Sequence, residues 1–292
     1  MCSLKESTLH INMHSFDTEK VSIPISQSLT LNIYSSNKPH NLKIAELQKG
    51  LILTYNGIQL VGEGAGFGLP VIVCPEETFF SGSAKVTISI VSGLVRIVKE
   101  FSMDRVLRNK FGKLQLENRQ VRSLLKYLAG LYQNNQSFRS VLFREFMTNL
   151  RIKSSFEKKD TVGKISVTYE VSKNNIKVQV DLSGVKTQYR KEIFILNEQS
   201  SHFFRKYSDS QGTTLTDNEI GAWNNSKGQY ASFTDVQDRF GFRVWQAEGA
   251  ILRYGREVMR NHLDWIGLDF EVNPKKDIFE YKVDLLGANL GW

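Results

Sequence analysis

Strict alternation of apolar and polar residues over positions 164–182 is the feature that most constrains the fold of this chain. The apolar positions on either side of the polar turn at 172–175 are Ile165, Val167, Tyr169, Val171, Ile176, Val178, Val180 and Leu182. Because successive side chains of a strand point to opposite faces, this period of two predicts a β-hairpin with one apolar and one polar face. The pattern favours an antiparallel sheet that packs on a core through one of its faces.

Similar strand patterns occur on both sides of this hairpin. They cover residues 22–34, 51–60, 84–90, 94–97, 190–196, 232–236, 240–246, 268–272 and 279–285. Many strands joined by turns, without repeating strand–helix units, favour a sandwich or barrel over a doubly wound sheet. We therefore expect a mainly β protein, built as a large antiparallel β-sandwich or super-sandwich.

The alternation is interrupted at Ser102. This serine is a candidate helix N-cap with Asp104 in the first turn, and Gly112 is a candidate residue to end that helix. Apolar residues then recur at helical spacing over 117–132. We expect residues 102–151 to form a basic insertion of two to three helices.

The insertion would divide the sequence into three parts. These are an N-terminal β region (1–101), the basic helical insertion (102–151) and a C-terminal β region (152–292). A chain of 292 residues is also compatible with one composite domain made from both β regions.

Positive charge is concentrated in the same segment. Residues 102–151 hold ten basic and three acidic residues, and so carry +7 of the net charge of +8. Arg119, Arg122 and Lys126 lie on one stripe of the expected helix, which supports nucleic-acid or other polyanion binding as an alternative function. The same stripe is also what the solvated face of a surface helix looks like.

A glycine-rich stretch occupies residues 62–68. Its glycines at alternate positions do not have the spacing of a dinucleotide fingerprint, and no P-loop lysine follows them. Two interpretations stay open. The stretch is either a close crossing of strands, or a ligand-binding loop in which Glu63 supplies a carboxylate and Phe67 a stacking surface.

The C-terminal half combines tryptophans with carboxylates and histidines. Aromatic rings beside hydrogen-bonding charged groups suit sugars, and paired carboxylates suit glycosidic chemistry. We therefore expect a carbohydrate-processing or carbohydrate-binding protein, whether or not it is an enzyme. The expected catalytic residues are Glu198, His202 and Glu257, and the expected ligand-binding residues are Trp223, Arg256, His262 and Trp265, together with Glu63 and Phe67. Alternatively, the tryptophans are core residues, or the chain is a non-catalytic protein-interaction module.

Neither an apolar leader nor a stretch long enough to span a bilayer is visible in the sequence, so we expect a cytoplasmic location. Cys2 and Cys74 do not make a disulfide framework. We expect no metal or cofactor, since His10 and His14 lack the glutamate of a zinc-binding HExxH motif. The expected partner is a carbohydrate or another hydroxyl-rich or acidic ligand.

Overall fold

Two antiparallel sheets make up the described part of the computed structural model, which covers residues 11–12, 20–24, 29–34, 49–55, 58–59, 65–75, 77–91, 94–111, 153–172, 174–259 and 263–287. The smaller sheet has the order β2 (Lys20–Pro24), β3 (Leu29–Tyr34), β4 (Ile52–Tyr55) and β5 (Ile58–Gln59). The larger sheet contains β1 (Ile11–Asn12), β6 (Gly66–Val73), β7 (Thr78–Val91), β8 (Leu94–Phe111), β9 (Lys153–Val171), β10 (Asn175–Asp181), β11 (Glu192–Ser200), β12 (Lys206–Asp209), β13 (Thr214–Thr216), β14 (Asn224–Asn225), β15 (Tyr230–Thr234), β16 (Gly241–Trp245), β17 (Ala250–Met259), β18 (Leu263–Val272) and β19 (Ile278–Leu286). The prediction of a mainly β chain with antiparallel sheets is therefore confirmed.

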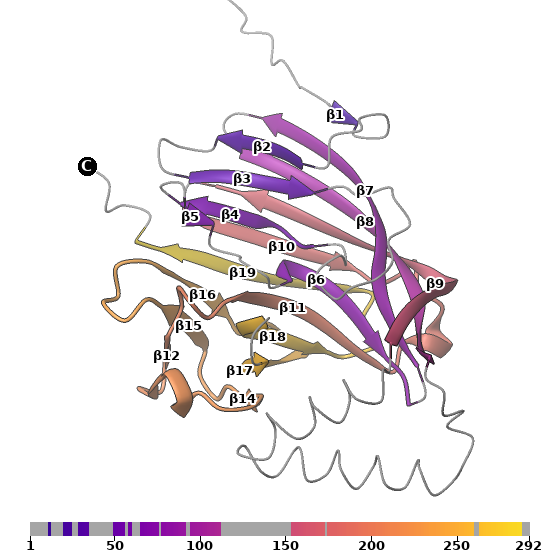
Figure 1. Cartoon of the computed structure of the whole chain (residues 1–292). Helices are drawn as coiled ribbons and strands as arrows, with labels where there is room; N and C mark the ends of the chain where they lie inside the picture. Colours follow the sequence, from indigo (N-terminus) through magenta and orange to yellow (C-terminus); the bar gives the residue numbers. More distant parts are fainter. Residues whose placement is uncertain are drawn as a thin grey trace, which may run out of the picture.

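The larger sheet doubles back on itself, so that two parts of it pack face to face (Figure 1). Its order is β13-β12-β15-β16-β19-β10-β9-β8-β7-β6-β11-β18-β17-β14, with β1 on β7. Strands β6, β11, β18 and β17 face β9, β10, β19, β16 and β12. Ring contacts that join the two layers include Phe67–Phe242 at 5.5 Å, Phe270–Phe279 at 5.0 Å and Tyr207–Tyr254 at 4.0 Å between centroids.

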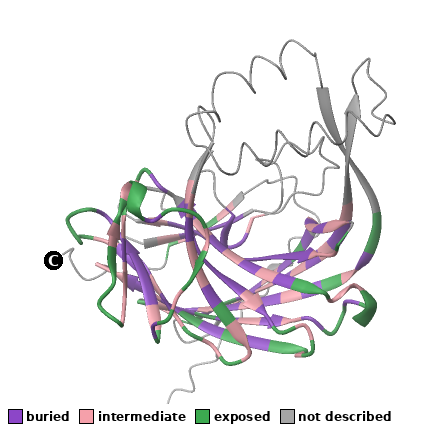
Figure 2. Cartoon of the chain, turned by 90° about the horizontal axis from the view of Figure 1, so that it is seen from below, coloured by how far each residue is buried: buried purple, intermediate pink, exposed green. Residues whose placement is uncertain are grey.

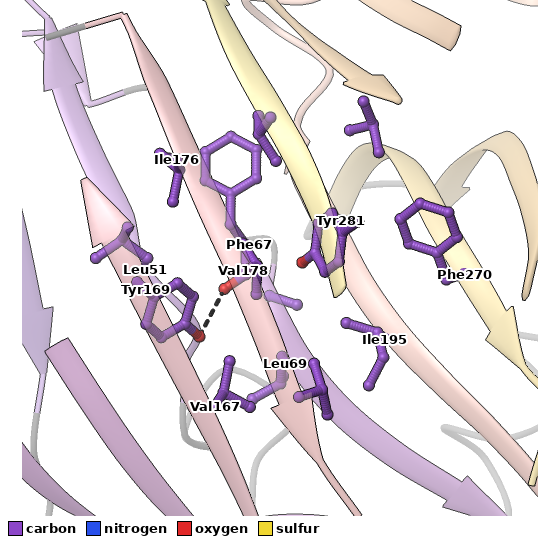
Figure 3. Packing of buried hydrophobic residues seen from close by; sticks show 14 of the residues in the cluster. Leu51, Phe67, Leu69, Val167, Tyr169, Ile176, Val178, Ile195, Phe270 and Tyr281 are labelled. Carbon is purple, nitrogen blue, oxygen red and sulfur yellow. Dashed lines mark hydrogen bonds between the residues drawn. The ribbon is translucent and has the colours of Figure 1, made fainter. Parts of the chain in front are cut away.

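The predicted hairpin of residues 164–182 is confirmed as the adjoining parts of β9 and β10. Val178 pairs with Tyr169 and Val180 with Val167, and all four side chains are fully buried. Tyr169 also donates a hydrogen bond from its hydroxyl to the carbonyl oxygen of Phe67 in the facing layer, at 2.9 Å (Figure 3). Buried and exposed residues alternate along the strands, as Figure 2 shows, because one face of each strand contacts the core.

The smaller sheet shares this core with the larger one. Leu31, Ile33 and Leu53 belong to the same buried cluster as the side chains of β6 to β10. At the junction, Leu51 forms an isolated antiparallel bridge with Phe67. The fully buried Lys99 of β8 donates a hydrogen bond from Nζ to the carbonyl oxygen of Lys49 at 2.6 Å, and burial lowers the pKa of Lys99 to about 7.

The predicted basic helical insertion is wrong. Strand β8 continues through Ser102 to Phe111 and pairs with β9 over this length. The supposed cap residues lie in this strand instead, where Ser102 Oγ of β8 and Thr161 Oγ1 of β9 both donate to Asp104 Oδ1, at 2.8 and 2.6 Å. Helical structure in the described residues is limited to the short 3₁₀ turns η2 (Thr187–Tyr189) and η3 (Asp217–Glu219). Arg119, Arg122 and Lys126 lie outside the described residues.

None of the helical turns in the described ranges is long and apolar enough to cross a membrane. The boundary expected between residues 101 and 102 falls inside β8, and the strands of the larger sheet come from both sides of it.

Candidate functional site

A cleft of about 250 Å³ lies on the outer face of β11, β18 and β17. The residues that line it are Phe194, Leu196 and Glu198 of β11, Asp269 of β18, Arg253 of β17, and Trp223, which immediately precedes β14. These side chains alternate with buried ones that point into the core, such as Ile195, Leu252 and Phe270. The period-two geometry of three neighbouring strands therefore places the lining residues on one outer surface.

Two glycines form the floor on which Trp223 lies. Gly255 of β17 and Gly267 of β18 are direct register partners. A Cβ atom added at Gly255 would lie 2.8 Å from Trp223 Cδ2, and one at Gly267 would lie 2.7 Å from Trp223 Cη2. Such distances are too short for real Cβ atoms. The indole ring can therefore lie against β17 and β18 only because both positions are glycine.

Glu198 and Asp269 meet the tryptophan above Gly267. The position of an added Cβ at Gly267 is 3.1 Å from Asp269 Oδ1 and 3.2 Å from Glu198 Cγ. Two carboxylate side chains and the edge of an indole ring therefore converge on one point of the cleft floor. Sequence reasoning predicted Glu198 and Trp223 for the site, and the structure brings these two together in the cleft.

Asp269 is held in place by the main chain of the neighbouring strand. Its side chain is only 4% exposed, and its Oδ1 accepts the backbone N–H of Asn197 at 2.7 Å. Asn197 lies at an irregularity in the pairing of β11 with β6, next to Glu198. The extra residue of this β-bulge is Gly68 of β6, which has a positive φ of 77°, because Leu196 pairs with Leu69 and Asn197 pairs with Phe67.

The bulge is fixed by buried hydrogen bonds. Asn197 Oδ1 accepts the hydroxyl of Tyr281 at 2.7 Å and the backbone N–H of Gly68 at 3.1 Å. Asn197 Nδ2 donates to the carbonyl oxygen of Leu268 at 2.9 Å. Burial raises the pKa of Tyr281, so this hydroxyl keeps its proton and remains a donor.

Arg253 supplies positive charge to the cleft wall. It is the register partner of Asp269, and its Nη1 lies 3.5 Å from Glu271 Oε2. Its guanidinium carbon lies 5.7 Å from the ring centroid of Phe194. The guanidinium Nε is buried and has no hydrogen-bond acceptor among the described residues. The cleft thus presents both acceptors and a donor to a bound molecule.

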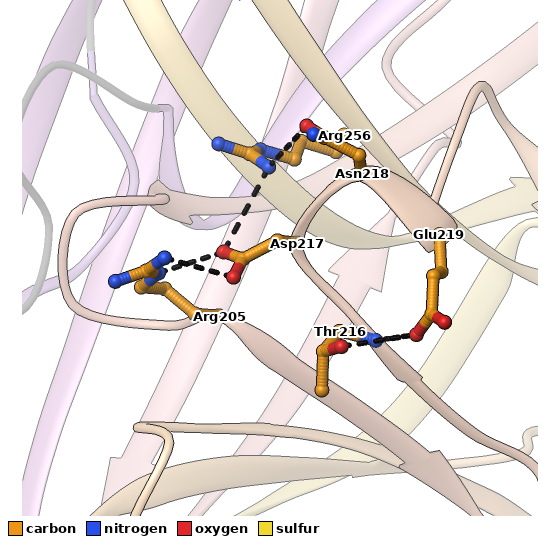
Figure 4. Close-up of polar contacts among 6 residues, drawn as sticks. All are labelled: Arg205, Thr216, Asp217, Asn218, Glu219 and Arg256. Carbon is orange, nitrogen blue, oxygen red and sulfur yellow. Dashed lines mark hydrogen bonds and ion pairs between the residues drawn. The ribbon is translucent and has the colours of Figure 1, made fainter.

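Arg256 is not among the residues that line the cleft, and it contacts the turn that leads to Trp223 (Figure 4). Its Nη1 lies 3.5 Å from Asn218 Oδ1 and 3.9 Å from Asp217 Oδ1, both in η3. Asp217 also accepts two hydrogen bonds from Arg205, at 2.6 and 2.8 Å, which hold the pKa of Asp217 below its ordinary value. The backbone N–H of Arg256 donates to Gly221 at 2.9 Å, so this network fixes the segment that carries Trp223.

Other residues expected in the site lie elsewhere. Phe67 is 1% exposed and packs in the core between the layers. His202 is exposed in the turn after β11 and is not among the residues that line the cleft. Trp265 is in β18, two residues before Gly267, and its buried Nε1 has no acceptor in the described structure. In β17, Glu257 is the register partner of Trp265.

Glu63 and His262 lie outside the described residues, as do Gly62 and Gly64 of the glycine-rich stretch. Sequence reasoning missed Asp269, Arg253 and the glycine pair. A signal for the glycines was present, since a glycine inside a strand often marks a close approach of another group. Within the described ranges, no three histidine, cysteine or acidic side chains gather to hold a metal ion.

Comparisons with known proteins do not assign the chain to a family. No protein-family model matches the sequence, and no curated protein matches it.

Proposed function

We propose that this protein binds carbohydrate, and that one sugar unit occupies the cleft between Trp223, Glu198 and Asp269. The observation that carries the proposal is the convergence of these three side chains above Gly267. An aromatic ring beside hydrogen-bonding carboxylates is the combination that sugar rings require, because a sugar has apolar C–H faces and a rim of hydroxyl groups.

The size and charge of the cleft fit this ligand. Its volume of about 250 Å³ is below the range of sites for drug-sized molecules, and suits a single ring. Glu198 and Asp269 supply hydrogen-bond acceptors for hydroxyl groups, while Arg253 supplies N–H donors. Phe194 and Leu196 add apolar surface at the other wall.

Binding, rather than hydrolysis, is the role that these contacts support. The expected catalytic residue His202 is not part of the cleft lining. One oxygen of Asp269 already accepts a backbone hydrogen bond at 2.7 Å, an arrangement that holds a carboxylate as a fixed acceptor.

Calorimetric titration with a panel of neutral monosaccharides and disaccharides tests the proposal. We expect at least one sugar to bind to the full chain, and Glu198→Gln to weaken that binding by about tenfold or more, because a hydrogen bond to a charged acceptor is lost. Glu280→Gln is the matched control, since Glu280 is exposed on β19 in the other layer and pairs with Lys177 at 3.2 Å.

The control variant should bind the sugar as the unchanged chain does, and both variants should keep the thermal unfolding midpoint of the unchanged chain. If no sugar of the panel binds, or if Glu198→Gln binds as tightly as the unchanged chain, the proposal is wrong.

A further inference from the structure

A second cluster of aromatic and charged side chains lies on the outer face of β15, β16 and β19, in the layer opposite the cleft. We call it the Arg243 patch, and it consists of Tyr230, Arg243, Trp245, Lys282 and Asp284. These residues alternate with Ala231, Phe242, Val244 and Val283, which are buried in the core. The patch therefore faces away from the interior.

Arg243 is separated from the carboxylate that the sheet places opposite it. Asp284 is the direct register partner of Arg243, the position at which a cross-strand ion pair is expected. Both oxygens of Asp284 are used by other groups. Trp245 Nε1 donates to Oδ2 at 2.5 Å, and Lys282 Nζ lies 2.8 Å from Oδ1.

The guanidinium group of Arg243 instead lies over aromatic rings. Its Cζ is 4.2 Å from the ring centroid of Tyr230 and 6.0 Å from that of Trp245. Its buried Nε has no hydrogen-bond acceptor in the described structure, and Arg243 forms no ion pair with any described residue. Among the residues that the structure describes, this half-buried cation thus has aromatic neighbours but no anionic partner.

This arrangement prepares Arg243 for a carboxylate from outside. The ring of Tyr230 holds the planar guanidinium in a fixed orientation through a cation–π contact. Less side-chain entropy is then lost when two parallel N–H groups bind a carboxylate.

We propose that the Arg243 patch binds an acidic segment of another protein, with a carboxylate of the partner on Arg243. Tryptophan, tyrosine and arginine are the residues that most often dominate the binding energy of protein interfaces, and the patch contains one of each.

Nucleic acid fits this surface less well. A strand of phosphates needs several unpaired cations along its path. On this face, Lys282 pairs with Asp284, and Lys177 of the neighbouring β10 pairs with Glu280 at 3.2 Å. One unpaired arginine beside two aromatic rings matches a single acidic side chain better than it matches a polyanion.

Fluorescence anisotropy of a labelled hexaglutamate peptide at low ionic strength tests this proposal on the full chain. We expect the peptide to bind, and Arg243→Gln to weaken binding by about tenfold or more. Arg243→Lys should also weaken it, because an ammonium group lacks the planar pair of donors. The matched control is Arg96→Gln, since Arg96 is an exposed arginine of β8 that lies 4.0 Å from Glu170.

Thermal unfolding of each variant confirms that the fold is kept. The proposal is overturned if the unchanged chain does not bind the peptide, if Arg243→Gln and Arg96→Gln have the same effect, or if a thymidine hexanucleotide binds at Arg243 more tightly than the peptide. These outcomes are independent of sugar binding in the cleft.

Discussion

At the scale of single residues, the candidate site depends on the absence of a side chain at Gly267. Gly267 leaves the space in which Trp223, Glu198 and Asp269 come together. Glycine inside a strand normally weakens it, because it has more conformational freedom to lose and no side chain to pack. The close approach of an indole ring and two carboxylates gives this position a physical reason for glycine.

We expect Gly267→Ala to lower both sugar affinity and stability. The new methyl group would lie 2.7 Å from Trp223 Cη2 and 3.1 Å from Asp269 Oδ1, so the ring and the carboxylate must move apart. Overpacking of this kind costs about 1–3 kcal/mol of unfolding free energy. Urea unfolding measures the loss of stability, and calorimetric titration measures the loss of affinity.

A double-mutant cycle with Trp223→Ala provides the control. If the ring is the group displaced, Gly267→Ala should cost much less unfolding free energy in the Trp223→Ala background than in the unchanged chain. Equal costs in the two backgrounds would show that the glycine acts through another contact.

At the scale of elements, a bulge in β6 lies opposite the part of β11 that carries Glu198. Asn197 of β11 lies opposite this bulge and bonds to β6, β18 and β19 through its side chain. Asn197, which is next to Glu198, thus links the cleft on the outer face to the packed interior. We therefore expect a substitution in the core next to Asn197 to change ligand binding in the cleft.

We expect Tyr281→Phe to lower the unfolding free energy by about 1 kcal/mol, the ordinary net value of a buried hydrogen bond, and to weaken sugar binding. The hydroxyl that donates to Asn197 at 2.7 Å is removed, while the ring contacts with Phe270 and Phe279 are kept. Urea unfolding and calorimetric titration are the measurements.

Tyr189→Phe serves as the matched control, because the ring of Tyr189 contacts Phe79 and its hydroxyl makes no hydrogen bond in the described structure. A loss of stability from Tyr281→Phe no larger than that from Tyr189→Phe would contradict the role given to Asn197.

The contrast between the hairpin and the supposed helix start shows what sequence patterns can and cannot predict. The β9–β10 pairing is predictable because its alternation is local and one face is fully apolar. The helix start predicted at Ser102 and Asp104 is wrong, because two polar residues at this spacing fit a helix cap as well as they fit hydrogen bonding to a neighbouring strand. Only the partner Thr161, more than fifty positions away, distinguishes the two.

The cleft was predictable only in part for the same reason. Glu198 and Trp223 stand out in the sequence as a carboxylate and an aromatic residue near others of their kind. Asp269 and Gly267 become partners of these residues only through the register of β11, β18 and β17. Register between strands distant in sequence is not encoded in any local pattern.

At the scale of the whole molecule, a buried lysine lies where the two sheets meet. Lys99 of the larger sheet donates to the main chain of Lys49, next to the smaller sheet. Burial lowers the pKa of Lys99 to about 7 from an ordinary value near 10.5. Between these two values the unfolded chain binds one proton more than the folded chain, so stability should rise with pH.

We expect the unfolding free energy to increase by about 1.4 kcal/mol per pH unit above pH 7, and this increase to be absent in Lys99→Met. Burial raises the pKa of Tyr169 and Tyr281, so the trend should reverse above about pH 10, where tyrosines of the unfolded chain ionise. Urea unfolding across this pH range is the measurement.

Lys85→Met is the matched control, because Lys85 is exposed on β7. It should keep the pH dependence of the unchanged chain. The same slope in the unchanged chain and in Lys99→Met would assign the effect to other groups.

The position of β19 has a consequence for how the chain is made. This strand lies between β10 and β16, although β10 precedes it by about a hundred residues. Until residues 278–286 have left the ribosome, β10 and β16 each present an open edge that other chains can pair with. We therefore expect a nascent or truncated chain that lacks β19 to aggregate. Synthesis of the full chain then depends on protection of these two edges until β19 pairs with them.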